Sequence, residues 1–245
     1  MISISINRKK ISIALVAIFI VLLVAHLLVI LLRYKLMPES PLAERWDQFF
    51  NMDREVNFPT YFNSILLFLA AQTFFLLGTS NQNRDDFYTR TYWYFLSAIF
   101  LFLSIDEFVR IHEWFVGWMP QIFGVGGTGI FKFAWIIPYG IFVIAFGFYS
   151  IRFLLSLKKE YLVKYLIAGA VYVTGALLFE AIGGMVFEQN NDKISFNYLF
   201  FFATPEETME MLALIYLINI NLKNLSISAS TDKESSSNPG KSTNR

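Results

Sequence analysis

The sequence predicts an all-α, polytopic integral membrane protein, folded as a bundle of about six transmembrane helices. Of the 245 residues, 56% are hydrophobic and only 16% are charged. The apolar residues are also gathered into blocks of about 20, the length that crosses a hydrocarbon core roughly 30 Å thick. These blocks occupy residues 11–32, 59–78, 92–112, 131–151, 162–186 and 198–220.

The first block follows Arg8, Lys9 and Lys10, as the apolar region of a signal peptide does. Its apolar run is too long for a signal peptide, and no small-residue cleavage site follows it, so we expect a retained helix. Residues 37–59, between the first two blocks, mix apolar and charged side chains. This mixture is typical of a short helix at the membrane interface, and we expect it to cap the outer face.

Basic residues concentrate at the amino terminus, in the 79–91 loop, in the 152–164 segment and in the tail. The positive-inside rule places these segments, and therefore both termini, in the cytoplasm of a bacterial-type inner or plasma membrane. Basic residues in the opposite loop reduce the asymmetry without reversing it: Arg33, Lys35, Arg45 and Arg54. We divide the chain into a transmembrane domain, 1–225, and a cytoplasmic tail, 226–245, whose Ser-, Asn- and Lys-rich composition predicts disorder.

Charge and cysteine content exclude several classes of function. The formal net charge is +1, and the basic residues do not form a stripe, so we expect no nucleic-acid partner. The chain has no cysteine, which excludes disulfides, thiolate zinc sites, iron–sulfur clusters and thiol nucleophiles. The expected partner is the lipid bilayer, and the composition sets no oligomeric state.

Acidic residues inside the apolar blocks are the strongest functional signal. A carboxylate in a transmembrane helix costs about 2.5 to 3.5 kcal/mol on insertion scales, so several together need a partner, a proton or a metal ion. At a helix rise of about 1.5 Å per residue, those in three different blocks fall at overlapping depths in the outer half of the bilayer. We therefore predict one shared site formed by Asp106, Glu107, Glu180, Glu206, Glu207 and Glu210.

Helical phase separates the residues around the SIDEFVRIHE segment. In a continuous helix, Asp106, Arg110 and Glu113 share one stripe, which favours an ion-pair ladder. Glu107 lies about 100 degrees from that stripe, and His112 lies well off both carboxylates. We therefore interpret His112 as an interfacial histidine, and His26 as one that hydrogen-bonds to a neighbouring helix. Both remain candidate metal ligands of lower weight.

Local motifs refine the last two blocks. Thr204 followed by Pro205 is typical of a helix start, which predicts a break within the sixth block, beside the acidic turn. Gly169, Ala176 and Gly183 form a small-residue seam that predicts close helix packing and turns Glu180 toward protein. The GVGGTG run at 124–129 lacks the strand and helix context of a dinucleotide-binding motif, so we expect a loop there.

Three functions remain open. In the first, carboxylates bind a divalent metal ion in a membrane enzyme that acts on a lipid or other hydrophobic small molecule, with Asp106, Glu107, Glu180 and Glu207 as candidate catalytic residues. In the second, the same acids carry protons or a coupling cation in a transporter. In the third, the chain is a noncatalytic assembly or signalling subunit whose acids pair with a partner helix.

Overall fold

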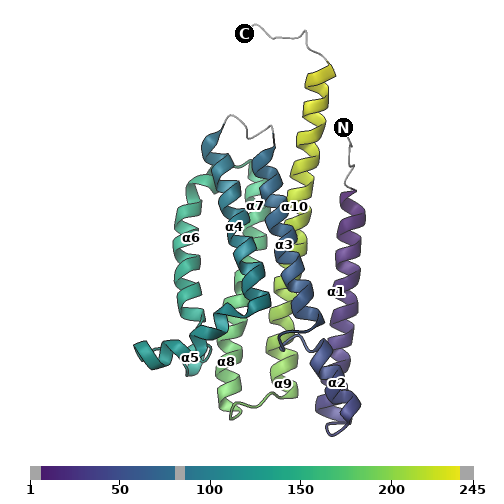
Figure 1. The fold of residues 1–245 in the computed structure, drawn as a ribbon, viewed down its shortest axis with the longest axis vertical. Helices are drawn as coiled ribbons and strands as arrows, with labels where there is room; N and C mark the ends of the chain where they lie inside the picture. Colours follow the sequence, from purple (N-terminus) through teal and green to yellow (C-terminus); the bar gives the residue numbers. More distant parts are fainter. Residues whose placement is uncertain (1–6, 81–85, 238–245) are drawn as a thin grey trace.

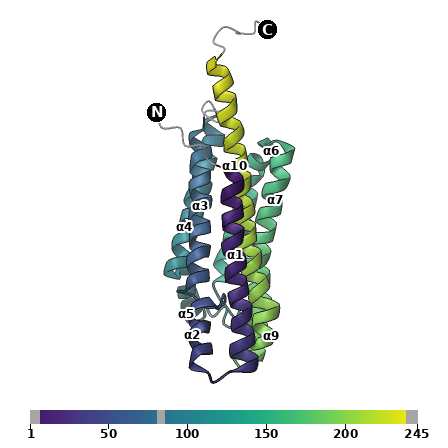
Figure 2. The same cartoon turned by 90° about the vertical axis from the view of Figure 1, so that its right-hand side faces the viewer.

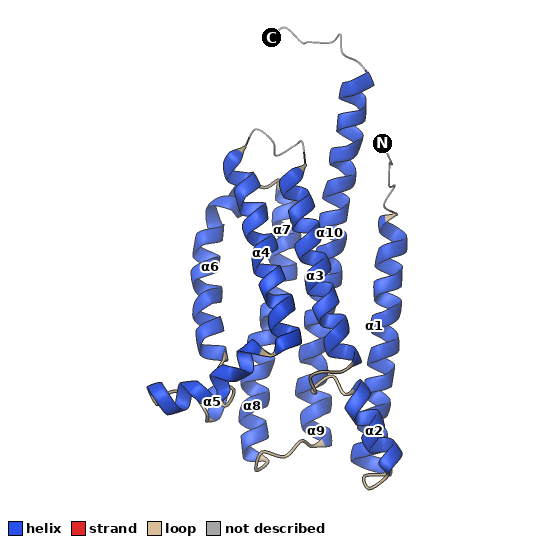
Figure 3. Ribbon diagram, viewed as in Figure 1, coloured by secondary structure: helices blue, strands red, loops and turns tan. Residues whose placement is uncertain are grey.

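The computed structural model describes residues 7–80 and 86–237, and every regular element in these residues is helical (Figure 1, Figure 3). The long helices are α1 (Arg8–Leu31), α3 (Phe58–Thr79), α4 (Phe87–Val109), α6 (Ile136–Ser156), α7 (Lys159–Val173) and α10 (Thr204–Ser237). The shorter elements are α2 (Pro41–Phe50), α5 (Ile111–Phe123), η3 (Gly129–Phe131), α8 (Glu180–Gln189) and α9 (Phe196–Tyr198). Three segments are π-helical: η1 (Leu32–Leu36), η4 (Thr174–Phe179) and η5 (Leu199–Ala203).

Five helical stretches in the described residues are long and apolar enough to cross a membrane by length and composition. They are Arg8–Leu36, Phe58–Thr79, Phe87–Val109, Ile136–Ser156 and Lys159–Gln189. The sixth expected segment, 198–220, lies in the stretch from α9 to α10, which is not among the five. Three glutamates near the start of α10, together with Asn219, Asn221 and Lys223 farther along it, lower the hydropathy of this helix.

The helices run along one long axis, and α1 begins at the end of the bundle where α10 finishes (Figure 1). The opposite end carries α2 and α5, which lie across or beside the long helices. Seen from the side, α1 lies against α10, as their contacts also show (Figure 2). The cap expected from residues 37–59 is therefore present as α2 and the loop that follows it.

The packed core lies between α1, α3, α4 and α10. Leu66, Leu67 and Ala70 of α3 are at most 1% exposed, as are Met211 and Leu214 of α10. These side chains belong to one continuous apolar cluster that extends to α1 and α4. By contrast, α6 buries few of its residues, so it is a peripheral wall of the bundle.

One local expectation differs from the structure. The chain does not break at Thr204, which has helical dihedral angles of −63° and −48°. The π-helical segment η5 ends one residue before Thr204-Pro205 and lets the helix pass the missing N–H without a break. The backbone of α10 continues to Ser237, and residues 238–245 lie outside the described part, so the disorder of the 226–245 tail stays a prediction.

The GVGGTG run is a loop, as predicted, and lies between α5 and η3. Gly124, Gly126, Gly127 and Gly129 all have positive φ values, a region that favours glycine.

Candidate functional site

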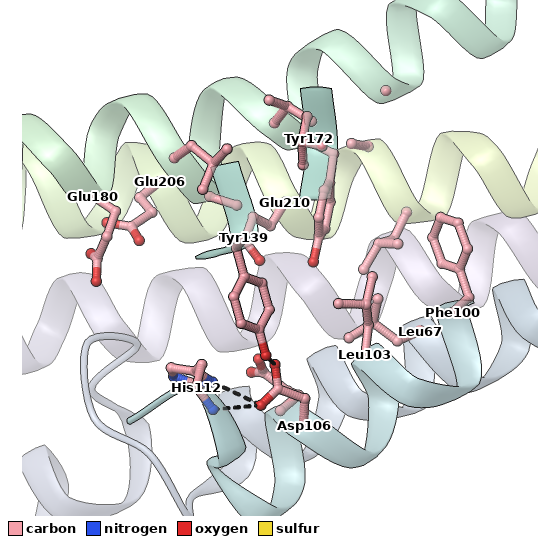
Figure 4. Close-up of a pocket in the computed structure, with 18 of the residues that line it drawn as sticks. Leu67, Phe100, Leu103, Asp106, His112, Tyr139, Tyr172, Glu180, Glu206 and Glu210 are labelled. Atoms are coloured by element: carbon pink, nitrogen blue, oxygen red, sulfur yellow. Dashed lines mark hydrogen bonds and ion pairs between the residues drawn. The ribbon is translucent and has the colours of Figure 1, made fainter. Parts of the chain in front are cut away.

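A single cavity of about 760 Å³ extends through the bundle between α3, α4, α6, α7 and α10. One end, the carboxylate chamber, is lined by acidic residues, namely Asp53, Glu55, Asp106, Glu107, Glu113, Glu180, Glu206, Glu207 and Glu210. The other end, the apolar channel, is lined mainly by aromatic and aliphatic residues that include Phe74, Trp93, Phe100, Leu103, Phe146, Phe153, Leu214 and Leu217. Figure 4 shows Leu67, Phe100 and Leu103 farther along the cavity from Asp106.

All six carboxylates expected to share a site line this one cavity: Asp106, Glu107, Glu180, Glu206, Glu207 and Glu210. The two histidines separate. His112 lines the chamber, whereas His26 does not line the cavity. The Nε2 atom of His26 lies 2.9 Å from Thr204 Oγ1, and its Nδ1 accepts a hydrogen bond from the Met52 N–H at 3.0 Å. His26 therefore joins α1 to α10 and to the cap, as a histidine bonded to a neighbouring helix would.

Asp106 is the best-connected carboxylate of the chamber. Its Oδ1 atom accepts a hydrogen bond from the His112 backbone N–H at 2.8 Å and lies 3.2 Å from His112 Nδ1. Its Oδ2 atom accepts a hydrogen bond of 2.5 Å from the Tyr139 hydroxyl. Figure 4 shows Tyr139 and His112 meeting at Asp106 from two sides. Asp106 thus links α4, α5 and α6.

The proximity of His112 to Asp106 corrects the interpretation of His112 as a purely interfacial residue. That interpretation assumed a continuous helix, but α4 ends at Val109, and Arg110 has left-handed dihedral angles of 66° and 43°. The turn redirects the chain, so that α5 begins directly over the Asp106 carboxylate. Neither glycine nor proline lies near Arg110, so the local sequence carries no signal for this turn.

Two acids of the chamber come from the loop between α2 and α3, outside the apolar blocks. Glu55 Oε1 lies 3.1 Å from His112 Nε2, so His112 is held between Glu55 and Asp106. Glu55 also pairs with Arg110, which in turn pairs with Glu113. The predicted ion pair between Arg110 and Glu113 is therefore present, but Arg110 does not share a continuous helical stripe with Asp106.

The second loop acid, Asp53, faces the same chamber from the cap. Burial raises the pKa of Asp53 to about 7, and a hydrogen bond from Tyr198 offsets only part of this effect. Burial by itself lowers the pKa of His112, but the hydrogen bond to Asp106 and the surrounding carboxylates outweigh burial and raise it. The charged form of His112 is therefore favoured more than in a free histidine, and near neutral pH Asp53 retains a large protonated fraction.

Glu180 and Glu206 lie next to each other across α8 and α10 (Figure 4). A side-chain hydrogen bond joins them. An ionised carboxylate only accepts hydrogen bonds, so this pair holds at least one proton. Glu180 directly follows the π-helical segment η4, and Glu206 lies just beyond the π-helical segment η5. Short π-helical segments within α-helices often occur at functional sites.

Gly175, within η4, sets the distance between these helices. A Cβ atom at Gly175 would lie 2.9 Å from the backbone oxygen of Glu206, closer than packing permits. Gly183 also packs closely, because its Cβ would meet Phe202 at 3.3 Å. Gly169, expected in the same seam, instead has nothing within 4 Å of a built Cβ atom and lines the cavity. The seam of close packing is thus centred on Gly175.

The remaining two glutamates share a single donor. Asn63 Nδ2 lies 3.3 Å from Glu107 Oε1 and 3.5 Å from Glu210 Oε2, so one amide of α3 joins α4 to α10. Glu207 lines the same chamber, and no hydrogen bond to it is formed among the side chains that the structure describes, 7–80 and 86–225. The chamber therefore contains more acceptor oxygens than protein donors.

The carboxylates and histidines gather loosely around the chamber. Within the described residues, no group of three or more His, Asp or Glu side chains has the arrangement of a preformed metal site. At the end of the chamber, Arg54 and Glu113 line the cavity and are also exposed to the outside. These two side chains form a polar mouth where the cavity meets the outside of the protein.

Comparisons with known proteins give a family and no activity. No curated protein matches this chain, and no solved structure matches it either. The family profile described as "Domain of unknown function (DUF8692)" matches residues 15–222, most of the chain. The chain belongs to this family of unknown function.

Proposed function

We propose that this chain is an integral membrane protein with six membrane-spanning segments, the five apolar helical stretches and α10. An even number of crossings agrees with α1 beginning and α10 ending at one end of the bundle (Figure 1). By the positive-inside rule that end faces the cytoplasm of a bacterial-type inner or plasma membrane, and the carboxylate chamber lies in the outer half. The acids of α10 then face the cavity, where ionisable residues in membrane proteins normally lie.

We propose further that this membrane protein is an enzyme that acts on a lipid or other hydrophobic, amphiphilic substrate. The observation that carries the proposal is the union of the carboxylate chamber and the apolar channel in one cavity. Its volume of about 760 Å³ falls in the range of about 300 to 1,000 Å³ typical of small-molecule sites. An alkyl chain in the channel would position the polar head of its molecule among the ionisable groups.

The groups around the chamber fit acid–base chemistry at that head. Asp106 fixes the orientation of His112, and Tyr139 supports Asp106 from the other side. His112, between two carboxylates, is positioned to hold and donate a proton. Glu207 lines the same chamber and belongs to its set of ionisable groups. Water for a hydrolytic step reaches them through the polar mouth at Arg54 and Glu113.

The excess negative charge of the chamber requires neutralisation, because close like charges at low dielectric oppose joint ionisation. The hydrogen-bonded pair of Glu180 and Glu206 supports protons in this role. A divalent metal ion bound by the carboxylates is the second way to neutralise the same oxygens. Elemental analysis of purified protein, wild type against Glu206→Ala, distinguishes the two, because a metal bound here would be lost in the variant.

The test of enzymatic activity uses purified protein in nanodiscs made from a bacterial total lipid extract. We expect time-dependent loss of one lipid or lipid-like component and appearance of its product in mass spectra. Asp106→Asn should slow this turnover at least about 100-fold, the lower range for general acid–base catalysis. Glu160→Gln is the matched control, because Glu160 lies outside the cavity and pairs with Lys164 and Lys223.

If folded protein turned over no component of the lipid extract, the proposed enzymatic function would be contradicted. A proton-coupled transporter is the second candidate, favoured by the succession of acids from Glu206 and Glu180 to Glu210 and Glu107 along the cavity. It predicts pH-driven proton flux in proteoliposomes that Glu207→Gln abolishes. Neither turnover nor flux would favour a noncatalytic membrane subunit.

A further inference from the structure

The two walls that α6 presents to its neighbours differ. Toward α4, α6 makes ring contacts at the end of the apolar channel, including Tyr92 with Phe153 at 3.9 Å between ring centroids and Phe95 with Tyr149 at 5.3 Å. The hydrogen bond from Tyr139 to Asp106 closes the chamber end of this wall. Toward α7, within the residues that the structure describes, no hydrogen bond, ion pair or ring contact reaches α6.

The open wall coincides with residues that face both the cavity and the outside. Leu166 of α7 lines the cavity yet is 50% exposed. Gly147 of α6 and Gly169 and Ala170 of α7 also line it and are exposed. These four residues are all apolar or small. They define a lateral mouth at the depth of the apolar channel.

The glycines keep this mouth open. A Cβ atom built at Gly147 or at Gly169 meets no other atom within 4 Å, so each glycine borders open space instead of a packed neighbour. By contrast, Gly175 and Gly184, in the same part of the chain, would each bring a Cβ to 3.0 Å or less from another atom. The absence of side chains at Gly147 and Gly169 therefore widens the gap between two helices without bringing them into contact.

Protein covers both ends of the cavity. The loop that follows α2 is fixed by Asp47, which accepts hydrogen bonds from Asn51 at 2.8 Å and Arg54 at 2.7 Å, and this loop covers the chamber end. At the opposite end, Trp93 and Phe153 are each 2% exposed and pack edge to face. The lateral mouth is therefore an apolar approach to the channel, separate from the polar mouth of the chamber.

We propose that the mouth between α6 and α7 admits the alkyl chain of an amphiphile from the bilayer, whose polar head carries no negative charge. The proposal rests on the proposed function and names the class of its substrate. The lining of the mouth and channel is apolar, which suits an alkyl chain. Nine acidic side chains line the cavity at the chamber end, and their oxygens can accept hydrogen bonds from a hydroxyl or ammonium head, whereas an anionic head has no hydrogen to donate to them.

Photolabelling in lipid vesicles tests this route independently of catalysis. The probes are long-chain compounds with a diazirine near the terminal carbon and an alcohol, amine or carboxylate head. Trp93 and Leu214 line the channel but are 2% and 1% exposed, so label on them reports a chain inside the cavity. Label on Val21 of α1, which is 66% exposed, reports contact with the bilayer and serves as an internal standard.

We expect the alcohol and the amine to label Trp93 and Leu214, and the carboxylate to label them at least about tenfold less. Gly147→Leu and Gly169→Leu, on opposite sides of the mouth, should each reduce this label at least about fivefold while leaving Val21 label unchanged. Gly140→Leu is the matched control: it is on the same helix and also borders open space, but it does not line the cavity, so its label should equal that of wild type.

Label on Trp93 and Leu214 that persists in both leucine variants would overturn the lateral route, as would its absence from wild-type protein. Equal labelling by the carboxylate probe would overturn the head-group assignment. Labelling needs no turnover, so label on Trp93 and Leu214 without any product would contradict only the proposed enzymatic function. Product without label on these two residues would contradict only the proposed lateral entry.

Discussion

Asp47 of the cap and the acids of the carboxylate chamber differ in how many hydrogen-bond donors their carboxylate oxygens have. Asp47 is fully buried, and its oxygens accept hydrogen bonds from Tyr34, Asn51 and Arg54. In the chamber, one Asn63 amide serves both Glu107 and Glu210, and Glu206 bonds to another acid, Glu180. A carboxylate with a full set of donors supports the fold, whereas surplus carboxylates beside a cavity leave oxygens free for protons or ligands.

The largest expected difference in stability follows from this contrast. Asp47→Ala removes the shared acceptor of three donors in the cap, so we expect the free energy of unfolding to fall by about 3 kcal/mol. Glu207→Gln removes a surplus acid, and we expect a change between zero and a gain of about 1 kcal/mol. Denaturant titration in detergent measures both. A loss for Glu207→Gln equal to that for Asp47→Ala would refute the distinction between the two regions.

Two glycines sharpen the same contrast at the level of helix packing. Gly175→Ala would place a methyl group 2.9 Å from the Glu206 carbonyl, so we expect a loss of about 1 to 3 kcal/mol as α10 is displaced. Gly169→Ala meets open space and gains helix propensity, so we expect a gain of about 0.5 to 1 kcal/mol. Thermal unfolding of the two variants gives the signs. Two shifts of the same sign would show that η4 and α10 do not pack as described.

The smallest predicted effect concerns pH. The pKa of Asp53 is raised from 3.8 to about 7, so the protonated form favours the folded state. This contribution is fully present below about pH 4 and is lost as the pH rises through about 7, lowering stability by roughly 1 to 2 kcal/mol after allowance for water in the cavity. Asp53→Asn should flatten the dependence of the melting temperature on pH between 4 and 8. An unchanged slope would contradict a buried, protonated Asp53.

The sequence predicted the all-helical fold, and the six carboxylates that it places at similar depths line one cavity, because apolar blocks and depths follow directly from residue spacing. Their role as a functional site stays a prediction. Three features depended on tertiary structure. The left-handed turn at Arg110 brings His112 to Asp106 without a local glycine or proline. The π-helical segment η5 lets the chain pass Pro205, where a break was expected. Glu55 and Asp53, charged loop residues, fold back into the chamber through the cap.

The lateral mouth shows the same limit for small residues. Gly147, Gly169 and Gly175 are alike in sequence context, since each lies within an apolar helix. Only the positions of the neighbouring helices decide that Gly175 permits close packing while the other two border open space. A spacing of small residues predicts that helices approach one another, but it does not specify which glycine makes the contact.

The central claim is that the surplus carboxyl groups of the chamber are kept uncharged by bound protons. Infrared spectroscopy of purified, chelator-treated protein tests this claim most directly. Protonated carboxyl groups have a carbonyl stretching band that ionised carboxylates lack and that shifts in deuterium oxide. We predict this band at neutral pH in the wild type, a weaker band in Glu206→Gln, and no change in Glu160→Gln, whose acid lies outside the cavity in an ion pair. A wild-type spectrum at neutral pH without a protonated carboxyl band would contradict the account.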